Sequence, residues 1–502
     1  MNAAELPTPA LSPAPIPPLD QPGDAKLRSQ VRSAVLWRSG TQVFSQLVAW
    51  GSTFLVIRIL SPTDYGLFAM TSVVLVLFGL LNGYGFANAV IAQRDGGKDQ
   101  LRQLFGLLIV VNVGLTALQI LLAPLVAAYY RQPIIADLLR VQALIYLTNP
   151  FQALGYAVLS RAMDFRRQAQ VNVVSALLSA ATALGCALAG FGVWTLVAAP
   201  FVMFASRALG TITVARAWMW PSFNFRGARA LAGYGGTIMA GQIFWFMQTQ
   251  ADIIVAGRTF APHELGFYTT ALFLSQVFVT KVVPPLNEVA FSAYAQIQDD
   301  LNAVGAGFLK SVRVIMTIAM PFCLGLAAVA FPAVRVMLGE KWLASAPVVQ
   351  LLCLAKPFMT LHVLFGPAAN ACGHPRVTTR SAMLGAVLMP LCYIVGVHWG
   401  APGIAASWLV AYPLLTAISA MWIMPLIGVR AAALRDALLP PVLGALAMAL
   451  GVTLLDRVLL PELPMLLRLS LLVATGGAIY GGWMAVFARD RLRELLDLVR
   501  KR

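Results

Sequence analysis

The chain has 502 residues, of which 59% are hydrophobic and only 11% are charged. Soluble proteins carry about 25% charged residues, so this composition excludes a soluble globular protein and indicates a membrane protein. The formal net charge of +16 would suit a nucleic-acid-binding protein, but the basic residues lie between apolar segments in the pattern of a membrane protein. We therefore expect membrane lipids as partners and no nucleic acid.

Residues 1–25 are rich in Pro and Ala and lack a basic region before an apolar core, so they predict a disordered cytoplasmic tail and no signal peptide. A membrane-spanning helix needs about 20 mostly apolar residues. Fourteen segments fit this rule: 36–57, 65–91, 103–128, 138–158, 168–190, 194–215, 234–257, 266–290, 310–332, 345–369, 380–398, 403–426, 437–456 and 468–488. Residues 489–502 place leucines on one helical face, which predicts an amphipathic cytoplasmic tail on the membrane surface.

The basic residues predict the orientation of these segments. Most of the 36 Lys and Arg residues fall in alternate connections, beginning with the stretch that precedes the first segment. Cytoplasmic loops of membrane proteins carry an excess of Lys and Arg. The pattern predicts a multi-pass protein of the bacterial inner membrane with both termini in the cytoplasm.

The chain contains an internal repeat. Five residues recur at a constant offset: Gln42, Phe44, Arg58, Pro62 and Gly66 return as Gln242, Phe244, Arg258, Pro262 and Gly266. We expect an all-α integral membrane protein with two six-helix lobes, at 26–220 and 221–428, and two extra helices within 429–488. Because six is even, both lobes have the same orientation. A parallel repeat of this kind predicts a pseudo-twofold axis along the membrane normal and a cavity between the lobes.

Three charged residues of the second predicted lobe fall well inside apolar segments: Asp252, Lys281 and Lys356. A Lys or Asp at the bilayer centre costs about 2.5–3.5 kcal/mol, so the sequence favours a polar cavity over lipid-facing positions, with extension of the lysines to the membrane surface as a further alternative. One interpretation is an ion pair between Asp252 and a lysine that locks helices together. The other is a cationic pocket for an anionic headgroup, formed by Lys281, Lys356 and Arg38, with Asp252 tuning the pocket or carrying a coupling proton. We expect Arg207 to extend to the membrane surface instead.

Amide side chains are the other candidates for a polar cavity lining, although each also suits helix–helix hydrogen bonding. They are Gln42, Gln46, Asn82, Asn88, Gln248 and Gln250. The four histidines and five cysteines are dispersed, and the sequence has no P-loop motif. We therefore expect no catalytic residue, no metal site and no cofactor. Energy for transport would come from an ion gradient, the membrane potential or consumption of the product.

Three stretches resemble the Wzx-type polysaccharide flippases of the multidrug/oligosaccharidyl-lipid/polysaccharide exporter superfamily. They are SGTQVFSQLVAWGSTFLVIRILSPTDYGLFAMTSVV, GFANAVIAQRD and QTQADIIVAGRTFAPHELGFYTTA. The resemblance implies a V of two lobes, alternating access, and transfer of a polyprenyl-(pyro)phosphate-linked oligosaccharide across the bacterial inner membrane. It also implies a role in exopolysaccharide or lipopolysaccharide biosynthesis beside the polysaccharide polymerase machinery. The pattern around Asp252 recurs in that family, whereas the roles of Lys281 and Lys356 are inferred from this sequence.

Two other functions remain open from the sequence. A multidrug or cation antiporter of the same superfamily typically has twelve helices and acidic residues in its cavity. A polysaccharide polymerase or ligase usually needs a large outer loop that carries Arg or His, and the predicted loops here are short. We expect a transporter and not an enzyme.

Overall fold

The computed structural model describes residues 24–82, 98–223, 228–458, 463–491 and 493. Within these ranges the chain forms helices and no strand. The main helices are α1 (Asp24–Ile59), α2 (Pro62–Leu81), α4 (Lys98–Tyr130), α5 (Ile134–Ala143), α6 (Asn149–Arg161), α7 (Phe165–Leu188), α8 (Trp194–Val214), α9 (Ala228–Thr259), α10 (Pro262–Gln296), α11 (Leu301–Ala328), α12 (Ala330–Met337), α13 (Ala346–Ala371), α14 (Pro375–Gly396), α15 (Gly400–Ile423), α16 (Ala431–Val458) and α17 (Met465–Phe487). Ten candidate membrane spans are found among the described residues.

The helical membrane fold is therefore confirmed, while several predicted boundaries are wrong. The segment 138–158 was predicted to form one helix, but α5 ends at Ala143 and α6 begins at Asn149, with a short 3₁₀ turn between them. Pro150 explains the break, because its nitrogen has no hydrogen to bond the carbonyl of Tyr146. Most of the predicted tails, 1–25 and 489–502, lie outside the described residues.

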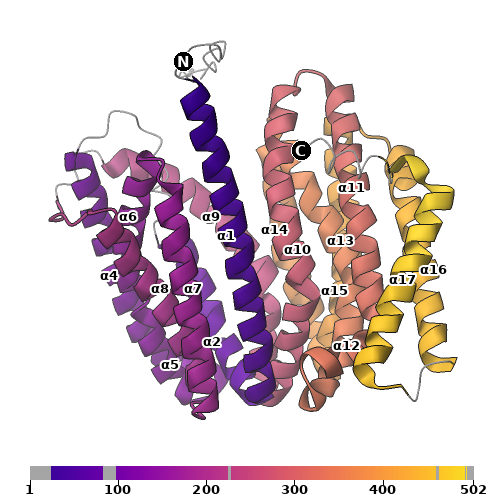
Figure 1. Cartoon of the computed structure of the whole chain (residues 1–502), viewed down its shortest axis with the longest axis horizontal. Helices are drawn as coiled ribbons and strands as arrows, with labels where there is room; N and C mark the ends of the chain where they lie inside the picture. Colours follow the sequence, from indigo (N-terminus) through magenta and orange to yellow (C-terminus); the bar gives the residue numbers. More distant parts are fainter. Residues whose placement is uncertain (1–23, 83–97, 224–227, 459–462, 492, 494–502) are drawn as a thin grey trace, which may run out of the picture.

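The helices form two groups that converge at one end and diverge at the other (Figure 1). Helices α1 to α8 lie on one side of the view and α10 to α17 on the other. Helix α1 begins and α17 ends at the diverging end. We refer to the converging end, where α1 and α9 finish and α2 and α10 begin, as the closed end.

Two glycines allow α2 and α10 to touch at the closed end. A Cβ on Gly66 would lie 1.8 Å from the carbonyl oxygen of Pro262, and a Cβ on Gly266 would lie 1.8 Å from that of Pro62. No residue larger than glycine fits either position without moving a backbone. The contact is reciprocal, because each copy of the repeated Pro–Gly pair packs against the other copy.

Two arginines of the repeat also reach across the closed end. Arg258, at the end of α9, donates to the carbonyl oxygen of Tyr129 on α4 at 2.5 Å. Arg58, at the end of α1, donates to the carbonyl oxygens of Met337, at 3.2 Å, and Val336 on α12. Carbonyls in the last turn of a helix lack intrahelical partners and carry its partial negative charge. Each arginine therefore binds a helix end in the other half of the chain.

A single apolar cluster continues across the two groups at this end. It contains Met70 of α2, Tyr130 of α4, Ala256 of α9, Leu265 of α10 and the fully buried Trp342. The indole nitrogen of Trp342 donates to the carbonyl oxygen of Ile57 at 2.9 Å. The closed end is thus held by a shared core as well as by polar contacts, so opening it exposes apolar surface.

Candidate functional site

A polar cavity of about 460 Å³ lies between α1, α6, α7, α8 and α10. Two basic side chains, Arg207 of α8 and Lys281 of α10, are in its wall. Its other polar lining residues are Thr41, Gln42, Ser45, Gln46, Tyr156, Gln168 and Asn172. None of the described lining residues is acidic. We call this space the cationic cavity.

The two prolines that follow Lys281 in α10 make this part of the helix more polar. The helix continues to Gln296 through Pro284 and Pro285. Neither proline nitrogen can donate, so the carbonyls of Thr280 and Lys281 receive no intrahelical hydrogen bond from them. The ammonium of Lys281 and these carbonyls make this turn of α10 more polar than its neighbours.

The cationic cavity is suited to an anion. The Lys281 side chain is exposed to the cavity, and within the described part of the chain it forms no ion pair or hydrogen bond. Charges of one sign in a cleft with low-dielectric walls focus the potential and concentrate ions of the opposite sign. The arrangement can therefore hold a phosphate or a carboxylate, with the amides of α1 and α7 as neutral hydrogen-bonding groups.

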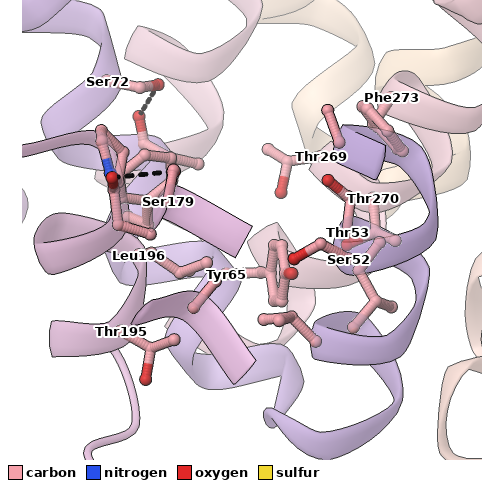
Figure 2. A pocket seen from close by; sticks show the side chains of 18 of the residues that line it. Ser52, Thr53, Tyr65, Ser72, Ser179, Thr195, Leu196, Thr269, Thr270 and Phe273 are labelled. Carbon is pink, nitrogen blue, oxygen red and sulfur yellow. Dashed lines mark hydrogen bonds between the residues drawn. The ribbon is translucent and has the colours of Figure 1, made fainter. Parts of the chain in front are cut away.

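A second cavity, of about 490 Å³, continues from the cationic cavity toward the closed end. Both cavities have Ala49, Ala176 and Met203 in their walls, so they adjoin. In Figure 2, Ser179 and Leu196 lie on one side of the second cavity, Thr269, Thr270 and Phe273 lie on the other, and the ring of Tyr65 lies between them. We call this space the hydroxyl chamber.

The structure brings together only part of the predicted site. Lys281, Gln42 and Gln46 line one cavity, as a shared site requires. Arg207, which was expected to extend to the membrane surface, has its side chain in the lining of the same cavity. The sequence signal for Arg207 was a basic residue within an apolar segment. That signal does not reveal whether the side chain faces a cavity or the membrane surface.

Lys356 lies elsewhere. Its side chain is fully buried on α13, with its Nζ atom 3.9 Å from the ring centre of Trp408 and 3.6 Å from the sulfur of Met359. It is not among the residues that line the cationic cavity or the hydroxyl chamber. The contact with Trp408 is a cation–π interaction, which stabilises a buried ammonium.

Asp252 is also buried, and its partners are neutral. Its Oδ2 atom accepts a hydrogen bond from the hydroxyl of Tyr268 at 2.7 Å, and its Oδ1 atom accepts from the backbone N–H of Ile253 at 2.8 Å. The Tyr268 oxygen accepts in turn from the indole nitrogen of Trp408 at 3.0 Å. The described residues show no ion pair between Asp252 and a lysine. Asp252 and Lys356 are connected instead through Tyr268 and Trp408.

Three other predicted residues, Gln248, Gln250 and Asn82, are described by the structure and line neither cavity. Gln248 is buried and packs against Gly385 of α14, and Gln250 is half-buried on α9. Asn82 ends α2, where its carbonyl oxygen accepts from the Asn112 amide at 3.2 Å. The side chain of Arg38 on α1 and the whole of Asn88 lie outside the described part of the chain.

The buried network around Asp252 predicts a loss of stability in one variant. Asp252→Ala removes the acceptor for the Tyr268 hydroxyl and the Ile253 N–H. Unsatisfied buried polar groups cost about 1–3 kcal/mol each, so we expect a lower thermal unfolding temperature in detergent. Thr249→Ala, on the same helix, is the control, because that hydroxyl bonds only within its own helix. Equal unfolding temperatures for Asp252→Ala and the wild-type protein would contradict the role assigned to Asp252.

The fold and the cationic cavity define a class: a multi-pass helical membrane transporter with an internal polar cavity. Among solved structures, the chain is similar to the lipid II flippase MurJ in an inward closed conformation, with a TM-score of 0.74 and 14% identity over 91% of this chain and 100% of that one. It is also similar to an inward-facing multidrug resistance MATE family transporter of the MOP superfamily. That match has a TM-score of 0.57 and 14% identity over 80% of this chain and 99% of that one.

The chain belongs to the polysaccharide biosynthesis protein family, whose sequence profile matches residues 55–347. It is similar to the succinoglycan biosynthesis transport protein ExoT of Rhizobium meliloti, with 27% identity covering 92% of this chain and 95% of that protein. It is also similar to the lipopolysaccharide biosynthesis protein WzxC of Escherichia coli, with 24% identity covering 80% and 82%. The resemblance inferred from the sequence is thereby confirmed.

Proposed function

We propose that the protein is a flippase for polyprenyl-(pyro)phosphate-linked oligosaccharide repeat units in the bacterial inner membrane, serving exopolysaccharide or lipopolysaccharide biosynthesis. The observation that carries this proposal is the cationic cavity. Lys281 and Arg207 line a space inside a helical membrane protein, and no acidic side chain lines it with them among the described residues. Membership of the polysaccharide biosynthesis protein family supplies the chemical class of the substrate.

We also infer the finer architecture. The count of fourteen spans treats α5 and α6 as one interrupted span. The two lobes comprise residues 26–220 and 221–428. Helices α16 and α17 are the additional pair within 429–488. Two sets of contacts support a parallel pseudo-twofold repeat. They are the reciprocal Gly–Pro contacts and the hydrogen bonds by which Arg58 and Arg258 each reach a helix end in the other half of the chain. The positive-inside pattern supports a cytoplasmic location for the diverging end, with the closed end facing outward.

The energetics favour a protein route for this substrate. Moving an ion into a medium of low dielectric constant costs of order 20 kcal/mol, so a pyrophosphate does not cross bare lipid unaided. Lys281 and Arg207 offset that cost while the polyprenyl tail stays in the membrane. An inside-negative membrane potential favours outward movement by about 2.3 kcal/mol per negative charge per 100 mV. This potential would drive net outward transfer of the substrate without ATP.

Other predicted residues have roles in this proposal. Arg38 would receive the phosphate at the cytoplasmic entrance. Asp252 would act in coupling, through its hydrogen bond to Tyr268 inside the second lobe. Lys356 would stabilise that lobe and would not contact the headgroup, because Trp408 and Met359 enclose its ammonium. The polysaccharide polymerase machinery would receive the product on the outer side.

Deletion of the gene tests this function. We expect surface polysaccharide to be lost while lipid-linked repeat units accumulate on the cytoplasmic side, with both quantities restored by the wild-type gene. Normal polysaccharide together with a broad rise in drug sensitivity would instead indicate an antiporter. Purified protein that joins repeat units would indicate a polymerase, and either result would overturn the proposal.

A further inference from the structure

The hydroxyl chamber differs chemically from the cationic cavity beside it. Helices α1, α2, α7, α8 and α10 form most of its wall, with Ile253 of α9, and none of its described lining residues is charged. Its polar groups are almost all hydroxyls, including those of Thr53, Tyr65, Thr195, Thr269 and Thr270. The rest of the wall is apolar, with aromatic rings from Tyr65, Phe68 and Phe273. Its ligand should therefore be neutral, rich in hydroxyls and partly apolar.

Two of these hydroxyls have no protein partner. Thr195 and Thr270 are almost completely buried, and the Oγ1 atom of each lacks a hydrogen bond within the described chain. A threonine in a helix usually donates to a carbonyl one turn earlier, as Thr269 does to Leu265 at 3.0 Å. Leaving a buried hydroxyl unbonded costs free energy. A ligand that offers hydrogen-bonding groups inside the chamber would remove this cost.

The volume and position of the chamber suit the sugar of a lipid-linked substrate. Its volume of about 490 Å³ falls within the range of about 300–1,000 Å³ that small-molecule pockets occupy. Sugars carry hydroxyls on their edges and present C–H groups on their faces, which pack against apolar and aromatic walls. An acidic or amino sugar would bring a charge that no described wall residue compensates.

We propose that the hydroxyl chamber is the sugar subsite of the transporter and that it selects neutral sugars. This inference rests on the proposed function. The phosphate lies between Lys281 and Arg207, and the first sugars of the repeat unit extend past Ala49, Ala176 and Met203 into the chamber. The headgroup thus enters with its sugar toward the closed end and its phosphate toward the cytoplasm.

The test measures binding of two probes to the full-length protein in detergent. One is polyprenyl pyrophosphate that carries a neutral disaccharide, and the other is the same lipid without sugar. The variants remove single hydroxyls and keep the side-chain shape: Tyr65→Phe, Thr195→Val and Thr270→Val. The Tyr65→Phe substitution would keep the edge-to-face packing of this ring on Trp342, which has a centroid distance of 5.5 Å. Thr213→Val on α8 is the matched control, because its hydroxyl is exposed and bonds within its own helix.

We expect each chamber variant to weaken binding of the sugar-bearing lipid about two- to tenfold, the range for one neutral hydrogen bond. Binding of the sugar-free lipid should not change, which also shows that the variant is folded. Lys281→Gln should weaken binding of both probes. If the chamber variants bind both probes like the wild-type protein, or lose both equally, the sugar subsite is wrong while the flippase proposal stands. If the wild-type protein binds neither probe, the flippase proposal itself fails.

Discussion

Lys281→Glu is expected to abolish export of surface polysaccharide. The lysine is the exposed cation of the cationic cavity, and the substitution places a carboxylate where the phosphate must bind. Two unit charges about 4 Å apart interact by roughly 4 kcal/mol at an effective dielectric constant of about 20, which corresponds to about a thousandfold in binding. Extracellular polysaccharide and cytoplasmic lipid-linked precursor, measured in a deletion strain that expresses the variant, report the effect.

Two substitutions are controls for this prediction. Lys310→Glu makes the same charge change at an exposed position on α11 outside both cavities, and it should leave export unchanged. Lys281→Arg keeps the positive charge and should retain most of the export. Normal export by Lys281→Glu at wild-type protein levels would remove this lysine from the site.

Gly66→Ala and Gly266→Ala are expected to prevent tight closure at the closed end. Each new Cβ would lie 1.8 Å from a proline carbonyl oxygen of the opposite helix, so α2 and α10 must separate. Overpacking of this kind costs about 1–3 kcal/mol, which changes the ratio of closed to open molecules about five- to 150-fold. Spin labels at Phe191 and Trp399, which are exposed in connections of the two helix groups, should report longer distances in a variant that lacks the native cysteines.

Gly79→Ala is the matched control, because a Cβ on this glycine of α2 would have no atom within 4 Å. It should leave the distances unchanged. An unchanged distance distribution in the folded Gly66→Ala, Gly266→Ala double variant would show that this glycine contact does not hold the closed end.

The sequence was sufficient to predict the helical membrane fold and to identify the repeated residues near the closed end. Arg58, Pro62 and Gly66 and their later copies were identified by repetition alone. That each glycine contacts the proline of the other copy required the structure, because repetition gives correspondence between positions and says nothing of distance. The break before α6 was also missed, although Pro150 marks it.

The site was only partly predictable, since apolar segments do not indicate which way a lysine points. Lys281 and Lys356 look alike in sequence, yet one lines a cavity and the other lies under Trp408. Helix rotation and tertiary packing decide between these outcomes. The same limitation hid Arg207 and the unpartnered hydroxyls of Thr195 and Thr270, which become visible only when several helices enclose one space.

Transfer of a lipid-linked oligosaccharide between the leaflets of proteoliposomes tests the central claim most directly. The purified protein is reconstituted with a fluorescent polyprenyl pyrophosphate oligosaccharide, and the fraction accessible to a membrane-impermeant quencher is followed with time. The proposed mechanism predicts rapid transfer by the wild-type protein, faster when the potential draws negative charge across, and transfer at the protein-free rate with Lys281→Glu. Transfer by the wild-type protein at the protein-free rate, or by Lys281→Glu at the wild-type rate, would contradict it.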